Sequence, residues 1–433
     1  MSDLKPTPPP IFPQAGNRGF GDLRGPVSAP GAGRQRKRKG GRVIVVVLLV
    51  VGLLAGITPL VYTQARRILG LYDPTASSDG VTLRTLPLRG PVAYSPDGHT
   101  LASWSNNGTV ELWDVGKGTR RHVLPFAVHS DARHSYRKVV FAPDSDTVAT
   151  ELNDGKTIQI WDTQTGATRT VIKVPVTHPQ GLMPLRVSKL VYSPDSRTIA
   201  ATGDRLQLWD VATGALRHRI DVSAQDAAFA PDGRTIAAVA ERQGGIWDVA
   251  TGARVHPLDP SGGHFAWTVG FAPDGRTVVA DGDRVRAWDT ATGAVRWSSG
   301  PYEGSTPVYA PDGSLLAERS GDDVWLVDPA SGKKLRTLRG LHGLLISVGN
   351  SEQVDQIAWA PNSHTLVVRH SRANESWANT PQVWDVRTGT ALQLLKGHKG
   401  PVQDVAYSPD GRTITTVSGD GTARIWPAPL TEG

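Results

Sequence analysis

The chain has 433 residues, with 47 glycines, 32 prolines, 13 tryptophans and no cysteine, which excludes disulfides, thiolate metal sites and a cysteine nucleophile. Its net charge of +7 is carried by the first 42 residues, which hold nine basic and two acidic side chains. The remaining residues sum to zero charge, so the body of the protein is not expected to bind nucleic acid, which requires a basic surface.

Residues 1–42 are predicted to form a disordered cytoplasmic tail. Proline and glycine are frequent in them and no apolar periodicity is present. A proline motif that docks a partner is the alternative to a plain solvated tail. The basic run from Arg34 to Lys39 could be a nucleic-acid patch. Its place before an apolar segment favours control of membrane topology and contact with anionic lipid headgroups.

Residues 43–63 are predicted to be a transmembrane helix. They contain no charge, and a helix of this length spans roughly 30 Å, the thickness of the hydrocarbon layer. Six basic residues lie just before the segment and two just after it, which favours a cytoplasmic N-terminus and an extracytoplasmic remainder. We therefore predict a single-pass protein of the cell membrane with an uncleaved signal anchor, and a linker over residues 64–80. A cleaved signal peptide is the alternative.

Two short phrases recur over residues 81–433. The first is an aromatic residue followed by Ser/Ala-Pro-Asp/Asn-Gly/Ser, in which proline presets φ and glycine supplies a positive φ, so each copy predicts a tight turn between strands. The second is Trp-Asp and a turn that ends in glycine. With the apolar and alternating runs between these turns, each repeat predicts four antiparallel strands. The first phrase begins at Tyr94, Phe141, Tyr192, Phe229, Phe271, Tyr309, Trp359 and Tyr407; the second begins at Trp113, Trp161, Trp209, Trp247, Trp288 and Trp384, and is altered at Val327 and Trp426.

These phrases resemble those of the WD-repeat family, in its bacterial, membrane-anchored form. The resemblance implies an all-β fold, an eight-bladed β-propeller, with seven blades as the alternative; blades stacked in a ring bury faces that a single repeat cannot. The last repeat supplies only three strands, and Val81 to Leu86 is similar to the outer-strand run Lys334 to Leu338. We therefore expect the N-terminal strand to complete the last blade and close the ring.

The resemblance also implies a structural network of histidine, serine or threonine, aspartate and tryptophan. Only the last repeat keeps it, as His398, then Thr416 or Ser418, then Asp420 and Trp426. In such a network the buried hydroxyl and imidazole satisfy each other's hydrogen bonds. We interpret these residues as structural rather than catalytic.

Four insertions interrupt the regular repeats, and all are expected on the face opposite the Pro-Asp-Gly turns. Irregular loops on a rigid scaffold often carry binding, so this face is the predicted site for a partner. The insertions are Ala127–Arg137, Val174–Arg186, Leu341–Val354 and His370–Gln382.

The candidate partner-binding residues lie in the first and last of these insertions. His129, Asp131 and His134 form a His-x-Asp-x-x-His pattern that could bind zinc, but its spacing matches no regular metal motif and we expect a solvated loop and no metal. Trp377 could be an exposed anchor for a protein ligand or could cover the ring. The complete candidate set is His129, Asp131, His134, Tyr136, Arg137, Arg372 and Trp377.

No catalytic or cofactor-binding motif is recognisable, and we expect no catalytic residues and no cofactor. The predicted function is a non-catalytic protein-interaction scaffold or ligand-binding ectodomain, held at the membrane by one helix, with an unidentified protein partner. The alternative is an exported propeller enzyme such as a quinoprotein-like dehydrogenase, lactonase or lyase. Trp288 to Trp297 looks like a quinoprotein blade phrase, but it occurs once.

Overall fold

The computed structural model describes thirteen segments of the chain, all within one compact unit, Pro59–Gly433. In them every regular element is a β-strand, and the strands form eight sheets. No helix in these segments is long and apolar enough to cross a bilayer, and the predicted segment 43–63 lies outside them. The segments are 78–79, 82–88, 90–104, 109–124, 139–152, 156–175, 187–240, 243–258, 268–300, 305–321, 323–339, 353–371 and 380–429.

Blades 1–6 are each a four-stranded antiparallel sheet whose strands follow chain order from the centre of the ring outward. Blade 1 is β3 (Val92–Tyr94), β4 (Thr100–Trp104), β5 (Val110–Asp114) and β6 (Thr119–Leu124). Blade 2 is β7 (Val139–Phe141), β8 (Thr147–Glu151), β9 (Thr157–Asp162) and β10 (Thr168–Lys173). Blade 3 is β11 (Leu190–Tyr192), β12 (Thr198–Ala201), β13 (Leu206–Asp210) and β14 (Leu216–Ile220). Blade 4 is β15 (Asp226–Phe229), β16 (Thr235–Val239), β17 (Gly244–Asp248) and β18 (Arg254–Pro257). Blade 5 is β19 (Val269–Phe271), β20 (Thr277–Ala280), β21 (Arg286–Asp289) and β22 (Val295–Ser298), and blade 6 is β23 (Ser305–Tyr309), β24 (Leu316–Ser320), β25 (Asp323–Val327) and β26 (Lys334–Arg339).

The last two blades take strands from the N-terminal side of the repeats. Blade 7 is β27 (Gln353–Trp359), β28 (Thr365–Ser371), β29 (Gln382–Asp385) and β30 (Ala391–Leu394), with β1 (Ser78–Asp79) added parallel to β30. Blade 8 is β31 (Val402–Tyr407), β32 (Thr413–Ser418) and β33 (Ala423–Pro427), and its outer strand is β2 (Arg84–Leu86). The predicted completion of the last blade is confirmed. Strand β1 lies within the linker predicted over residues 64–80; its two residues carry no strand pattern of their own and pair with the edge of β30.

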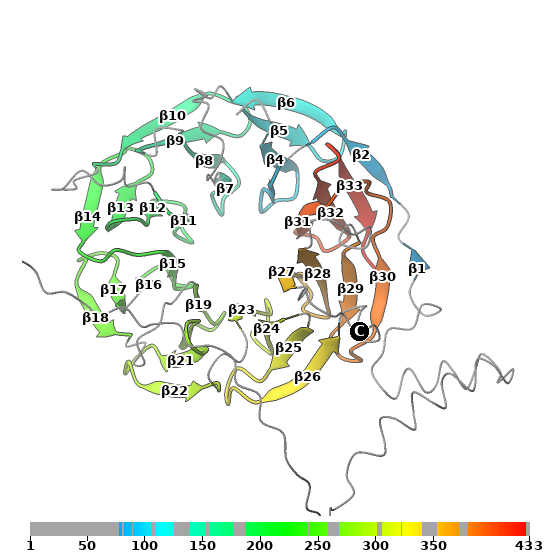
Figure 1. Ribbon diagram of the computed structural model, residues 1–433. Coiled ribbons are helices and arrows are strands. Elements are labelled where there is room, and N and C mark those ends of the chain that lie inside the picture. Colours follow the sequence, from blue (N-terminus) through cyan, green and yellow to red (C-terminus); the bar gives the residue numbers. More distant parts are fainter. Residues whose placement is uncertain are drawn as a thin grey trace, which may run out of the picture. The chain divides into compact units, whose positions relative to one another are not determined.

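The eight blades follow one another around a ring (Figure 1). Strands near the centre contact those of the next blade, and β3 contacts β31, which closes the ring. Eight blades are therefore confirmed and the seven-bladed alternative is excluded.

The apolar core lies between the blades rather than within them. Eight clusters of buried apolar residues are present in the described segments, and each joins two neighbouring blades. Trp161 of blade 2, for example, packs with Leu112 and Leu124 of blade 1, and its indole N–H donates to Thr150 Oγ1 at 2.9 Å. The repeated tryptophan is thus a junction residue, which is why each blade needs a neighbour on both faces.

Seven junctions also share a polar contact at their outer edge. A side chain of the outer strand donates to a backbone carbonyl in the Trp-Asp turn of the next blade, as His218 Nε2 does to Ala250 at 2.8 Å. The others are Arg84 to Val115, 2.9 Å; His122 to Gln164, 2.7 Å; Thr170 to Val211, 2.9 Å; His256 to Ala291, 3.0 Å; Trp297 to Pro329, 2.8 Å; and Arg336 to Thr388, 2.9 Å.

Ring closure combines backbone hydrogen bonding and apolar packing at and next to the strand β2. The amide of Leu83 donates to the Ile425 carbonyl at 2.7 Å, and Leu86 is buried with Leu101 and Trp113 of blade 1. The side chain of Leu83 is 59% exposed, whereas Leu86 is 3% exposed.

Replacing Leu86 with alanine is therefore expected to lower the free energy of unfolding by about 2–5 kcal/mol. The matched change Leu83→Ala, one residue before the same strand and in solvent, should cost less than about 0.5 kcal/mol. Denaturant unfolding of the two variants measures the difference. Equal effects would show that the closing strand does not pack into the ring.

In three of the proline turns, two Pro-Asp and one Pro-Asn, serine stands where the others have glycine. Ser145, Ser196 and Ser363 have φ of 67°, 61° and 62°, a left-handed conformation that disfavours side chains. Each hydroxyl is used across a junction: the amide of Asp144 donates to Ser196 Oγ at 3.1 Å, and Asp97 and Asp312 donate likewise to Ser145 and Ser363. The hydrogen bond offsets the strain.

Ser196→Ala should be destabilising by about 1 kcal/mol, because it keeps the strained side-chain position and loses the acceptor. Ser196→Gly should be close to neutral, because relief of strain compensates for the lost bond. Thermal unfolding of both variants tests this. A glycine variant as unstable as the alanine variant would refute the compensation.

Candidate functional site

The blades define two faces of the ring. The Pro-Asp and Trp-Asp turns join first to second and third to fourth strands, so they share one face, which we call the turn face. Connections from second to third strands, and from one blade to the next, share the other, which we call the insertion face. The strands that flank all four predicted insertions place their ends on the insertion face: β6 and β7, β10 and β11, β26 and β27, and β28 and β29.

The seven candidate partner-binding residues lie outside the described residues, so their positions stay a prediction. They are His129, Asp131, His134, Tyr136, Arg137, Arg372 and Trp377. In the part of the chain that the structure describes, no group of three or more acidic or histidine side chains could hold a metal ion.

Aspartates at the inner strands tie neighbouring blades together near the insertion face. Asp226, at the start of β15, accepts from the amide of Val269 in blade 5 at 3.1 Å and forms an ion pair with Lys189 of blade 3. Asp281 accepts from the amide of Thr306 in blade 6 at 3.0 Å. Strands of separate sheets do not pair through their backbones. The carboxylates accept hydrogen bonds from backbone amides of the next blade instead.

A carboxylate also joins neighbouring blades where blades 7, 8 and 1 meet, and there it has the most hydrogen-bond partners. Asp404 accepts from the amide of Val92 and from Gln356 Nε2, both at 2.7 Å. Burial raises the pKa of Asp404, against the lowering effect of these donors. Arg369 donates to Gln356 Oε1 at 3.2 Å and pairs with Asp355 at 2.5 Å. These groups hold the ring closed, and the half-exposed Asp355 is the member available to a partner.

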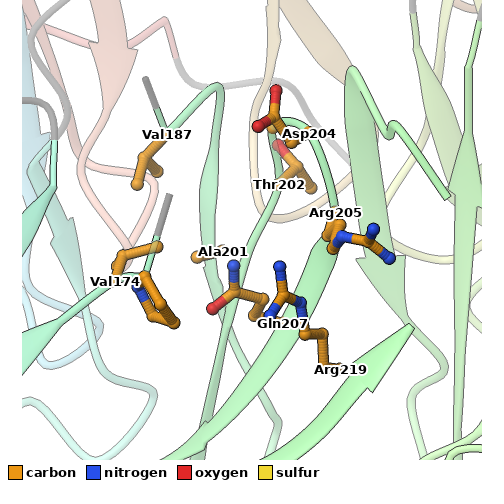
Figure 2. A pocket seen from close by; sticks show the side chains of 10 residues that line it. Val174, Val187, Ala201, Thr202, Asp204, Arg205, Gln207 and Arg219 are labelled. Carbon is orange, nitrogen blue, oxygen red and sulfur yellow. The ribbon is translucent and has the colours of Figure 1, made fainter. Parts of the chain in front are cut away.

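A small hollow opens on the insertion face of blade 3, at the foot of the insertion after β10 (Figure 2). Its volume is about 20 Å³, room for about one water molecule. Gln207 is 4% exposed and lies beside Arg219. Its Oε1 atom has no hydrogen-bond partner. The hollow therefore offers a buried acceptor beside Val174, Pro175 and Val187, the described residues at the two ends of this insertion. Nothing in the sequence indicated it, because Gln207 looks like an ordinary polar residue of a strand.

The residues of the expected histidine network meet in blade 8. His398 Nδ1 bonds to Asp420 Oδ2 at 3.0 Å, and its Nε2 bonds to Thr416 Oγ1 at 2.8 Å. Trp426 Nε1 also donates to Thr416 at 2.8 Å, whereas Ser418 Oγ donates to the Gly400 carbonyl at 2.8 Å. Both imidazole nitrogens are thus occupied in a buried site, an arrangement that stabilises the fold.

Comparison with protein families finds WD repeats near the beginning and near the end of the repeat region. A family model described as "WD domain, G-beta repeat" matches residues 92–114 and 389–427. A solved structure of the C-terminal WD40 domain of Sif2 superposes with a TM-score of 0.63 at 13% identity, covering 82% of this chain and 99% of that one. At this identity the likeness establishes the fold alone.

Short segments of the chain are also similar to larger proteins. Nuclear distribution protein PAC1 of Arthroderma otae is 39% identical over 116 residues, which are 26% of this chain and 24% of PAC1. Coronin-7 of Rattus norvegicus is 28% identical over 25% of this chain and 12% of its own length. Anaphase-promoting complex subunit cdh1 of Dictyostelium discoideum is 36% identical over 18% and 10%. The chain matches a quarter or less of these relatives, and nothing in the comparisons points to a bacterial or membrane-anchored type.

The histidine network makes stability depend on pH. Burial holds the pKa of His398 below 6.5, its usual value, so below that pH the unfolded chain binds a proton that the folded chain does not. The free energy of unfolding should fall as pH drops below about 6.5, by up to about 1.4 kcal/mol per pH unit from this group.

Denaturant unfolding of the wild type and His398→Asn at several pH values measures this contribution. The variant should lose the part of the slope due to His398, whereas His364→Asn, in an exposed turn, should keep it. An unchanged slope in His398→Asn would contradict the assignment.

Proposed function

We propose, from the premise that this chain is a WD40-repeat β-propeller, that it is a non-catalytic protein-interaction scaffold that binds its partner through the insertion face. The observation that carries the proposal is the difference between the two faces. Short, near-identical turns occupy one, and the strands flanking all four insertions end on the other. A rigid ring fixes where these loops begin and end, which lowers the entropy cost of binding.

The relatives support this mode of action and no particular partner. The name of one, anaphase-promoting complex subunit cdh1, describes a member of a protein complex. We extend to this chain only the role in protein assembly, because the similarity covers a small part of each protein.

We further propose that residues 43–63 anchor the propeller in the cell membrane, with the N-terminus in the cytoplasm. The support is the uncharged 21-residue run and the excess of cations before it. Anchoring would confine the scaffold to partners in the envelope or outside it.

The residues that suggested a propeller enzyme have a packing role. Trp288 and Trp297 are 3% and 8% exposed. Trp288 belongs to the core between blades 4 and 5, and Trp297 to the core between blades 5 and 6. The quinoprotein-like phrase is therefore explained by blade junctions.

Site-specific photo-crosslinking in cells tests the choice of face. A photoreactive side chain at the exposed positions Ser188 or Ser223, on the insertion face, should give discrete adducts with another protein. The same group at His99 or Arg197, in exposed turns of the turn face, should not. Adducts formed only from His99 and Arg197 would overturn the proposal.

Protease protection tests the membrane topology separately, with a C-terminal tag on the full chain. Digestion of the propeller only when protease reaches the outside of the membrane is the expected result. A propeller protected until the cytoplasm is opened would contradict the anchor orientation while leaving the choice of face intact.

A further inference from the structure

Blade 6 lacks a hydrogen bond that the other seven blades make on the turn face. The residue after the Trp-Asp aspartate, or its equivalent, donates its amide to a carbonyl of the Pro-Asp turn in the same blade. Blade 6 has Pro329 at this position, which has no N–H, so the Ser314 carbonyl receives no donor from it. The seven bonds run from Val115 to His99, Thr163 to Asp146, Val211 to Arg197, Val249 to Arg234, Thr290 to Arg276, Val386 to His364 and Ala428 to Arg412, at 2.8–3.1 Å.

Pro329 also stands where other blades have a side chain that packs into the junction core. The equivalent Val249 and Val386 are 9% and 5% exposed and pack into the junction cores. Between blades 5 and 6 a cavity of about 260 Å³ opens instead, bordered by both turns of blade 6.

A tyrosine hydroxyl that is paired at other junctions is unpaired in this cavity. Tyr192 and Tyr407 bond to Thr147 and Thr365 of the preceding blade, at 3.4 and 3.0 Å, and Tyr94 bonds to Thr415 at 2.5 Å. The corresponding pair here is Tyr309 and Thr277, and both line the cavity. The Tyr309 hydroxyl is buried and has no hydrogen-bond partner, which costs about 1–3 kcal/mol unless another group supplies one.

The charge around the cavity is acidic. Asp274, Asp312 and Asp328 line it, and none of them forms an ion pair of 4 Å or less with a residue that the structure describes. Arg296, the cation in the lining, is already bound to Asp289 at 2.6 Å. The Ser331 hydroxyl lowers the pKa of Asp328. Burial opposes ionisation of Asp312, but the amide and hydroxyl of Ser314 outweigh it and lower its pKa, so both are ionised at neutral pH.

We propose that this cavity binds an arginine side chain of a protein partner. The cavity offers several acceptors: carboxylates that form no ion pair with a described residue, the Ser314 carbonyl, which lacks the amide donor of the other blades, and the unpaired Tyr309 hydroxyl, whose oxygen can accept. A guanidinium offers five N–H donors in a plane with a positive charge, and Pro273, Pro329 and Ala272 give its aliphatic stem an apolar wall. The cavity lies on the turn face, so this site is independent of the proposed function at the insertion face.

The probe is N-acetyl-arginine amide, with N-acetyl-citrulline amide as the uncharged isostere, titrated against the folded protein by NMR or calorimetry. We expect the arginine probe to bind with a Kd on the order of 1 mM, as a small ligand of this kind allows, more weakly at high salt. The citrulline probe should bind at least about tenfold more weakly.

Two variants remove the site with residues that the chain itself uses at the same positions. Pro329→Val restores the amide donor and the filling side chain found in blade 4, and Tyr309→Phe restores the phenylalanine of blades 2, 4 and 5. Each should keep or raise the melting temperature and weaken the arginine probe at least about tenfold. Tyr192→Phe, at the closed junction of blades 2 and 3, is the matched control and should bind the probe as the wild type does.

A crystal soaked with the arginine probe should show the guanidinium between Asp312 and Asp328. Equal binding of the citrulline probe, unchanged binding by folded Pro329→Val, or no binding by the wild type would each overturn the proposal.

Discussion

At seven of the eight junctions, the outer strand of one blade extends a side chain to the Trp-Asp turn of the next blade. At the junction of blades 4 and 5, His256 donates to the Ala291 carbonyl, and Gly293 lies so close that a Cβ there would be 3.0 Å from the imidazole. Gly293 also has φ of 73°, so this position needs glycine for two reasons. At each of these seven junctions the donor is on an outer strand, and in blade 8 that strand is β2, which supplies Arg84. The strand that closes the ring therefore makes the same contact to blade 1 that the other outer strands make to their neighbours.

The repeats predicted the eight blades and the closing strand because turn chemistry and strand alternation are local properties. The Pro-Asp-Gly phrase at Phe229, for example, places both the turn and the flanking strands β15 and β16. What the sequence did not predict are contacts between residues of different repeats, such as His218 with Ala250, or Asp404 with Val92. Their pairing appears only when the blades stack. The strand β1 was missed because two residues carry no periodicity.

The candidate site shows the same division. The sequence identified the insertions by their length, and the strands around them fix the face on which they begin. Gln207 and the inner aspartates were missed because a polar residue in a strand looks like an exposed one until its neighbours are known. The sequence shows that Pro329 differs from the equivalent residues of the other blades. Its effect appears only in the structure, where those residues donate an amide hydrogen bond from the Trp-Asp turn to the Pro-Asp turn. In a regular repeat protein, a residue that differs from its equivalents in the other repeats is therefore informative. The other blades show which contact the different residue no longer makes.

Hydrogen exchange of the intact protein, followed by mass spectrometry, tests most directly that the ring is one closed unit. The amides of β2 that pair with β33 should exchange as slowly as those of β31, β32 and β33, because opening β2 exposes the core between blades 8 and 1. Rapid exchange in β2, with full protection in the rest of blade 8 and in blade 1, would contradict the account, since the ring would then be stable without its closing strand.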